Sequence, residues 1–319
     1  MRSDVVLRGV IPANLIAFDA DLEIDERNYR RHLRHIVDTQ GVSGITTNGH
    51  AAEVATLSPE EQRRSLSITV DEVAGKVPVV CGIFEDGTGK AVRTAKMAES
   101  EGADCLLIFP SGIFDYGSQL KPEMIVDHYA TIAEATDLPM IAFVYPATSG
   151  LHIPTETLVE VCNVIDNVIA IKEWSNDIRV YEDNWRALKA LDKEISVFSS
   201  FSTALLPSLC VGADGILSGH GSLIADLQVE IFDAVQEGDL RRARRISDKI
   251  YPLVKTFYAD PFLDGHNRMK VANAMLGRME NAYVRPPMCS IGEKDTEAVR
   301  RAILDADLPG SREELLEVR

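Results

Sequence analysis

The chain has 319 residues, 45% of them hydrophobic, which is long enough for one large core or two ordinary domains. A formal net charge of −16 at pH 7 argues against nucleic acid or an anionic membrane surface as a partner, although it leaves room for a local basic pocket that binds a small acid. Residues 1–4 do not begin a secretory signal peptide, and no apolar run approaches the roughly 20 residues of a membrane span.

Short apolar runs recur along the first two-thirds of the chain and predict eight strands. They lie at residues 5–15, 42–46, 77–82, 105–109, 140–145, 168–172, 195–199 and 215–218. Amphipathic stretches between them predict helices at 25–40, 58–74, 90–101, 122–136, 154–164 and 181–191. The second of these helices opens with an N-cap serine, Ser58, then a proline and a glutamate at its first and third positions, which is a specific helix-start signal.

Strands that alternate with helices predict a parallel sheet, and eight such units close a (β/α)8 TIM barrel of roughly 250 residues. The competitor is an open doubly wound sheet, which is expected to carry a glycine-rich phosphate loop; the chain has no GxGxxG or Walker motif. From residue 224 the pattern changes to helices without intervening strands, at 224–237, 240–258, 266–276 and 293–304. We therefore expect a barrel domain at 1–223 and a C-terminal helical domain at 224–319 packed directly on it, with a charged, solvated tail after residue 309.

Lys172 ends the apolar run at 168–172, which has the composition of a buried strand. Burial disfavours the charged ammonium and lowers its pKa, and a neutral amine is a nucleophile that forms a Schiff base with a carbonyl substrate. The alternative is a lysine that extends out of the strand end into solvent or pairs with Glu173.

In a barrel, the active site lies at the C-terminal ends of the strands. This rule selects the segments at 46–53, 143–146, 172, 199–200 and 218–221. A Schiff-base enzyme needs a lysine on that face and a nearby group that can relay protons, such as Tyr145.

Several motifs together resemble the dihydrodipicolinate synthase / N-acetylneuraminate lyase family of class I aldolases, over nearly the whole chain. They are Gly9 to Ala13 with Phe18, Gly49 to Glu53, Thr56 to Glu61, Pro78 to Gly82, Gly102 to Asp104, Tyr145-Pro146 with Gly150, Ile171-Lys172, Gly212 to Ser218 and Arg285 to Met288. The resemblance implies a barrel with a C-terminal helical domain, a Schiff-base lysine at Lys172 and no cofactor. It also implies a homo-oligomer, commonly a tetramer built from dimers.

The chain departs from the family pattern in the loop after the second strand. There the family usually has a Gly-Thr/Ser-Thr-Gly-Glu motif whose hydroxyl and amides hold the carboxylate of a 2-oxo acid. In the register fixed by Glu53, that motif falls on Gly49, His50 and Ala51, so the hydroxyls are absent. Backbone amides can still bind a carboxylate, and His50 either adds a donor or a proton or is a loop histidine without a role.

A second departure concerns the catalytic tyrosine of the family, which aligns without gaps on Phe143. Tyr145 lies two residues further along, and residues i and i+2 point to the same face of a strand. We therefore expect Tyr145 to be the proton relay, the alternative being a core or rim tyrosine.

Other losses argue against dihydrodipicolinate synthase proper: its arginine after the fifth strand falls near Thr148, and its acidic pair falls on Phe201-Ser202. Ser199, Ser200, Ser218 and His220 predict a hydroxyl-lined pocket that suits a polyhydroxylated or uncharged tail. We expect Gly49, His50, Ala51, Ser200 and Ser218 to bind substrate.

Five cysteines, an odd number without framework spacing, are typical of a protein in a reducing cytoplasm. Neither a Cys-x-x-Cys pair nor a Cys/His cluster indicates zinc. The leading hypothesis is a lyase that forms an imine with pyruvate or a related 2-oxo acid, for aldol cleavage and condensation or for dehydration of a 2-keto-3-deoxy sugar acid. The alternatives are a binding or regulatory barrel that has lost catalysis, and a metal-dependent class II aldolase, for which His50 and His220 are the best pair of ligands.

Overall fold

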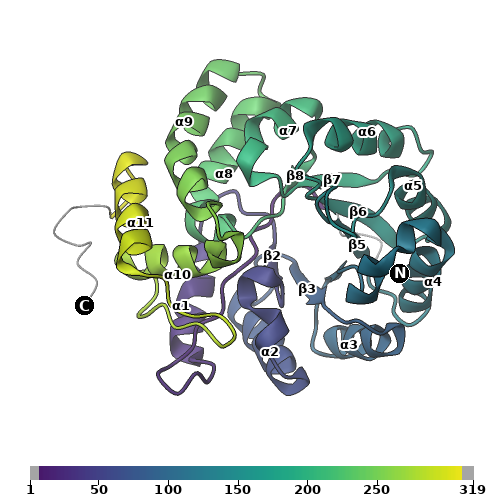
Figure 1. Cartoon of the computed structure of the whole chain (residues 1–319), viewed down its shortest axis with the longest axis horizontal. Helices are drawn as coiled ribbons and strands as arrows, with labels where there is room; N and C mark the ends of the chain where they lie inside the picture. The colour runs from purple at the N-terminus through teal and green to yellow at the C-terminus, as the bar shows by residue number, and fades with distance from the viewer. Residues whose placement is uncertain (1–6, 311–319) are drawn as a thin grey trace.

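The computed structural model describes residues 7–310, in which eight parallel strands form a closed barrel surrounded by helices (Figure 1). From β2 to β8 each strand pairs with the next in chain order, and β8 pairs with β1. Bridges from Val10 to Val42 and from Ala13 to Thr46 close the circle between β1 and β2. The strands are β1 (Gly9–Val10), β2 (Ile45–Thr47), β3 (Val79–Ile83), β4 (Cys105–Ile108), β5 (Met140–Val144), β6 (Val168–Glu173), β7 (Ser196–Ser199) and β8 (Gly215–Ile216).

The predicted (β/α)8 TIM barrel is therefore confirmed. Each of the eight expected runs overlaps its strand, and β2, β3 and β6 extend one residue past the predicted end; residues 5 and 6 of the first run lie outside the described residues. The barrel helices are α1 (Glu26–Val37), α2 (Pro59–Val73), α3 (Thr88–Ser100), α4 (Pro122–Ala133), α5 (Thr155–Val164), α6 (Ile178–Lys189), α7 (Leu205–Val211) and α8 (Gly221–Gln236).

Two helix boundaries show where local chemistry decides. The capping box predicted at Ser58 is present: the Ser58 hydroxyl accepts from the Glu61 N–H, and the Glu61 carboxylate accepts from the Ser58 N–H. Helix α6 begins three residues before the predicted start because the Asp177 side chain caps the N–H of Arg179. Helix α7 was not predicted, since its seven residues are too few to show helical periodicity.

Alternation along the strands divides the core into two layers. An inner layer fills the barrel, and on β5 and β6 it takes Ile141, Phe143 and Ala170. An outer layer, between strands and helices, takes the alternate residues Ala142 and Ile171. The period of two thus directs Lys172 toward the barrel interior and Glu173 toward the helices.

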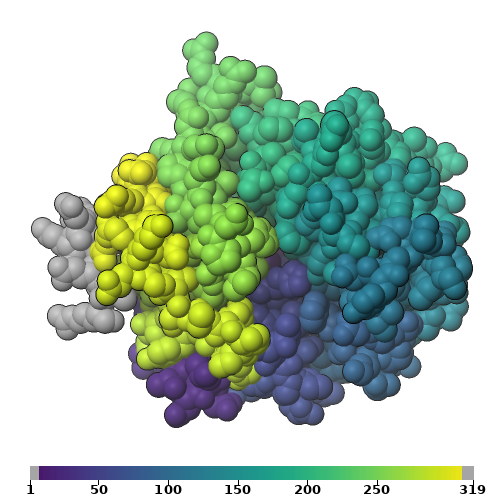
Figure 2. All heavy atoms as spheres, viewed as in Figure 1, coloured from purple at the N-terminus to yellow at the C-terminus, as the bar shows by residue number. Residues whose placement is uncertain are grey.

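The last helices gather on one flank of the barrel, where they lie against the N-terminal part of the chain (Figures 1 and 2). They are α9 (Leu240–Phe257), α10 (Gly265–Met275) and α11 (Glu293–Asp305), so the four expected helical stretches after residue 224 are present as α8 to α11. Because α8 contacts β1, β8 and α1 as well as α9, the domain boundary at 223/224 stays a prediction. The charged tail expected after residue 309 lies, from residue 311 on, outside the described residues. Within residues 7–310, no helix has both the length and the apolarity needed to cross a membrane.

Candidate active site

A cavity of about 570 Å³ opens at the C-terminal ends of the strands. Its walls come from the loop after β2, the ends of β5 and β6, the loops after β7 and β8, and the C-terminal part of the chain. The lining residues are His50, Glu53, Val54, Ala55, Thr56, Phe143, Tyr145, Pro146, Thr148, Ser149, Lys172, Trp174, Ser200, Gly219, Tyr258, Phe262, Leu263, Gly265, His266 and Met288.

Lys172 stands in this cavity at the end of β6, with 7% of its surface exposed. Its register partner on β5 is Phe143, and the Lys172 Nζ lies 4.0 Å from the centroid of that ring. Burial lowers the pKa of Lys172 from 10.5 to about 7. Within residues 7–310 the amine has no hydrogen bond or ion pair. It is therefore a desolvated amine, largely free of its proton just above neutral pH.

The alternative partner, Glu173, points the other way. Its carboxylate accepts from the backbone N–H of Ser175 and from Asn184 Nδ2 at 3.2 Å, in the outer layer. Burial raises the pKa of Glu173 to about 7. No ion pair between Lys172 and Glu173 forms in the described chain, because neighbours on a strand project to opposite faces.

Tyr145 lines the same cavity, on the same face of the chain as Phe143, as the spacing predicts. Its hydroxyl is hydrogen-bonded to His50 Nε2 from the loop after β2. Burial raises the pKa of Tyr145 above its ordinary value of 10. Burial, and secondly the charges of Lys172 and His266, lower the pKa of His50 to about 3. Both side chains are therefore neutral at pH 7, and one hydrogen bond joins them.

The other predicted site residues divide into two groups. Ser200 lines the cavity, whereas Ser218 accepts a hydrogen bond from Gln228 Nε2 at 2.9 Å and is not among the described lining residues. Gly49 and Ala51 also stand outside the described lining, on either side of His50 at the start of a short 3₁₀ turn, η1 (His50–Ala52).

Three of the four residues expected to form a hydroxyl-lined pocket do not line the described cavity, and the hydroxyls of Thr56, Thr148 and Ser149 line it instead. Of that set only Ser200 lines it: Ser199 bonds to Ser208, and the His220 ring packs edge-on against Phe257 and Tyr258. The cause is strand alternation, since Phe198 and Leu217 take the inward positions and their serine neighbours face outward.

The sequence does not single out several of the cavity residues, among them Trp174, Tyr258, Phe262 and His266. The sequence held a signal for Trp174, which stands two residues after Lys172 and so shares its face. The other three come from the C-terminal part, and nothing in their local pattern shows that they reach the barrel mouth. Gly219 leaves room for His266, because a methyl group there would lie 2.9 Å from His266 Nε2.

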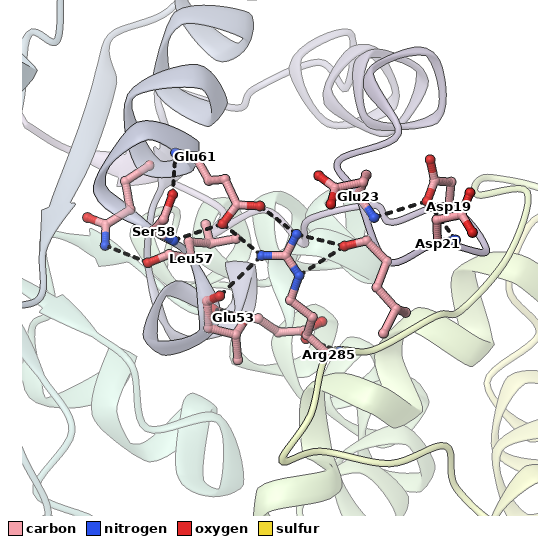
Figure 3. Close-up of polar contacts among 11 residues, drawn as sticks. Asp19, Asp21, Glu23, Glu53, Leu57, Ser58, Glu61 and Arg285 are labelled. Carbon is pink, nitrogen blue, oxygen red and sulfur yellow. Dashed lines mark hydrogen bonds and ion pairs between the residues drawn. The ribbon is translucent and has the colours of Figure 1, made fainter.

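The loop after β2 is fixed by two cations from the C-terminal part, Lys270 and Arg285, which we call the latch; Figure 3 shows the Arg285 side of it, beside Glu53 and Glu61. Lys270 Nζ forms an ion pair with Glu53, whose other carboxylate oxygen accepts from the Arg285 N–H at 3.0 Å. The Arg285 guanidinium binds Glu61 on α2 and the carbonyl oxygen of Leu22. The latch therefore holds the turn that carries His50 against both the barrel and α2.

The described residues contain no group of three or more His, Cys, Asp or Glu side chains arranged to hold a metal ion. The two histidines considered as ligands are separated in role: His50 lines the cavity, whereas His220 is buried against Phe257 and Tyr258.

Comparisons with known proteins give a consistent result. Residues 6–306 match the model of the dihydrodipicolinate synthetase family. The 4-hydroxy-tetrahydrodipicolinate synthase of Methanopyrus kandleri is 30% identical over 298 residues, which is 93% of this chain and 95% of that protein. An uncharacterised DapA-like lyase of Halobacterium salinarum is 31% identical over 95% of this chain and 93% of its own. The crystal structure of dihydrodipicolinate synthase from Aquifex aeolicus superposes with a TM-score of 0.85 at 25% identity, over 95% of this chain and 99% of that one.

Proposed function

Because this chain belongs to the dihydrodipicolinate synthetase family and is a lyase-type enzyme, we propose that it acts through an imine between Lys172 and pyruvate or a related 2-oxo acid. The observation that carries the proposal is the isolated, desolvated amine of Lys172, whose pKa is lowered to about 7. An amine that is half deprotonated near neutral pH attacks a carbonyl carbon without first giving its proton to a base.

Tyr145 and His50 supply the proton transfers that imine chemistry needs. Attack by Lys172 gives a carbinolamine, and loss of its hydroxyl as water requires a proton. The Tyr145 hydroxyl lines the same cavity and is hydrogen-bonded to His50, so it can donate that proton and be reprotonated through the imidazole. We therefore assign the proton relay to Tyr145, because Phe143, which aligns with the catalytic tyrosine of the family, has no hydroxyl.

The substrate carboxylate is assigned to the loop after β2. The backbone N–H groups of His50 and Ala51 begin the turn η1 and donate to no acceptor within residues 7–310. Gly49 precedes them with nothing within 4 Å of where a Cβ would lie, which leaves the approach open. Ser200, across the cavity mouth, adds a hydroxyl that can contact the substrate.

The test is trapping of the imine. Incubation with pyruvate and borohydride should add the mass of a reduced pyruvate adduct to the peptide that contains Lys172. The variant Lys172→Met is the matched control and should show no adduct. An unmodified Lys172 with pyruvate and with several longer 2-oxo acids would leave the fold but refute imine catalysis, and would favour a barrel that only binds its ligand.

We also propose that the protein is a cytoplasmic homo-oligomer, a tetramer or dimer. All five cysteines are free thiols, three of them buried, as a reducing compartment allows. Ile113, Tyr116 and Leu120, in the short turns after β4, are strongly exposed apolar side chains close together in sequence, which suits a subunit contact. Light scattering that gives a monomer mass at micromolar concentration would contradict this part of the proposal.

A further inference from the structure

The cavity is much larger than a three-carbon acid requires. Its volume of about 570 Å³ falls within the range of about 300–1,000 Å³ that drug-sized ligands occupy. It also extends from a buried end to an open one: Lys172 is 7% exposed, whereas Phe262 and Leu263 in its lining are 44% and 62% exposed. The part of the cavity beyond the reacting carbonyl therefore has room for a substantial substrate tail.

Four neighbouring aromatic rings line part of this space, and we call them the aromatic wall: Phe143, Trp174, Phe262 and Tyr258. It begins at Phe143, directly beside the Lys172 amine. Successive ring centroids are 6.0, 5.6 and 5.8 Å apart, and successive planes are inclined by only 31°, 24° and 26°. Phe262 stacks with both Trp174 and Tyr258, and the apolar ring surface that these side chains leave toward the cavity can pack against another planar ring, face to face or edge to face.

The charges around the cavity restrict the tail further. Lys172 and Glu53 are the charged side chains in the described lining, and Glu53 is already bound by the latch. A second anionic group on the tail would find no cation to pair with. The lining also carries the hydroxyls of Thr56, Thr148, Ser149 and Ser200, so a polyhydroxylated tail is the competing occupant that the experiment has to separate from an aromatic one.

We propose, on the basis of the imine function above, that the substrate of this enzyme is a 2-oxo acid whose tail carries a planar aromatic ring, and that this ring lies along the aromatic wall. For a 4-aryl-4-hydroxy-2-oxobutanoate the reaction is an aldol cleavage. The 4-hydroxyl gives up its proton, the electrons of the C3–C4 bond pass into the Lys172 enamine, and an aromatic aldehyde leaves. C3 of the enamine then takes a proton, and water hydrolyses the imine to release pyruvate, so no oxidant or reductant is needed.

The experiment compares tails on the same reactive head. The half-saturating concentration for borohydride trapping at Lys172 is measured for pyruvate, 4-phenyl-2-oxobutanoate and 2-keto-3-deoxygluconate. The phenyl compound should trap at a concentration about tenfold or more below that of the sugar acid, as ring stacking and apolar burial together give. Phe262→Ala should lower the preference for the phenyl compound over pyruvate about tenfold. Tyr251→Ala removes an exposed aromatic outside the cavity and should leave that preference unchanged.

The possible failures are separable. If the sugar acid traps as well as the phenyl compound or better, the aromatic tail is wrong and the imine function stands. If no acid is trapped, pyruvate included, the imine function fails, and binding alone then tests whether the aromatic wall holds an aromatic ring. The chain has two tryptophans, so Trp185→Phe leaves Trp174 as the sole reporter. Quenching of its fluorescence by 4-phenyl-2-oxobutanoate at a concentration at which 2-keto-3-deoxygluconate has no effect supports the wall as an aromatic subsite; equal or absent quenching overturns it.

Discussion

Burial keeps the amine of Lys172 neutral, and this burial lowers the stability of the fold. Without the ionisable group, the free energy of unfolding would be larger. Burial lowers the pKa of Lys172 from its ordinary value of 10.5, which the unfolded chain keeps, to about 7 in the folded protein. Below pH 7 both states hold the proton, and the full penalty of burying the ammonium is present. Between the two values the unfolded chain binds one more proton than the folded protein, so the free energy of unfolding rises with pH across this window.

Lys172→Met removes the ionisable group and keeps an unbranched apolar side chain only one atom shorter beside Phe143. We expect it to raise the free energy of unfolding at pH 7 by about 2–4 kcal/mol. The gain should shrink as pH rises from about 7 toward 10.5 and disappear above that. Urea unfolding of both proteins at pH 7, 8.5 and 10 measures it. A pH-independent difference would mean that Lys172 is solvated and ordinary.

The same pKa predicts the pH dependence of imine formation. Only the neutral amine attacks, so the rate of pyruvate trapping should rise with pH through about 7 and level off above it. Initial trapping rates between pH 5.5 and 9 test this. A rate that continues to rise tenfold per unit up to pH 9 would show that the amine is not desolvated in solution.

Tyr145 and His50 act as one hydrogen-bonded pair, so the effects of replacing each of them should not add. Tyr145→Phe should lower kcat about 100-fold or more, because the relay acts in the transition state, while the half-saturating concentration of pyruvate changes little. Adding His50→Gln to Tyr145→Phe should cost little more, since the pair acts as a unit. Tyr258→Phe is the matched control: its phenol lines the cavity but bonds to Ser202 instead of His50. Equal losses in both tyrosine variants would place the relay elsewhere.

At the scale of elements, the loop after β2 depends on the latch more than on its own residues. Glu53 and Lys270 have side chains only 1% exposed, so removing one partner leaves the other charge buried and unpaired. Lys270→Met should therefore lower the free energy of unfolding by about 3–5 kcal/mol. Lys76→Met breaks a pair with Asp38 in which both side chains are about half exposed, and should cost less than about 1 kcal/mol. Urea unfolding measures both variants. Similar losses in the free energy of unfolding would show that the buried ion pair stabilises the fold no more than the exposed one.

The elements that the sequence reveals are those with a local cause. The capping box at Ser58, the apolar run that ends at Lys172 and the i, i+2 relation of Phe143 and Tyr145 all follow from chemistry within a few residues. The bond between His50 and Tyr145, two residues 95 positions apart, does not. Nor does the aromatic wall, because the segment that carries Phe262 reaches the mouth only through the packing of α9 and α10. The absence of Ser199 and Ser218 from the cavity also has a local cause that the sequence shows, because strand alternation turns both side chains outward.

At the scale of the whole molecule, the barrel and the C-terminal helices share one core. A single cluster of buried apolar residues extends from Val10 on β1 to Leu308 beyond α11. Helix α8 contacts both β1 and α9. The latch adds a buried ion pair between the two parts. A C-terminal part that unfolded alone would expose the outer layer around α8, and would remove one wall of the cavity together with Phe262 and His266.

We therefore expect the two parts to unfold in one transition. Trp174 reports on the barrel mouth, and a fluorophore on Cys289, an exposed thiol before α11, reports on the C-terminal part. Cys210→Ser removes the other exposed thiol, and Trp185→Phe removes the second tryptophan. In urea the two signals should give the same midpoint, because a shared apolar core makes partial unfolding costly. Lys270→Met should shift both midpoints together. A label transition that precedes the Trp174 transition would show instead that the helices after 223 are an independent domain, and that the cavity can open by losing them while the barrel stays folded.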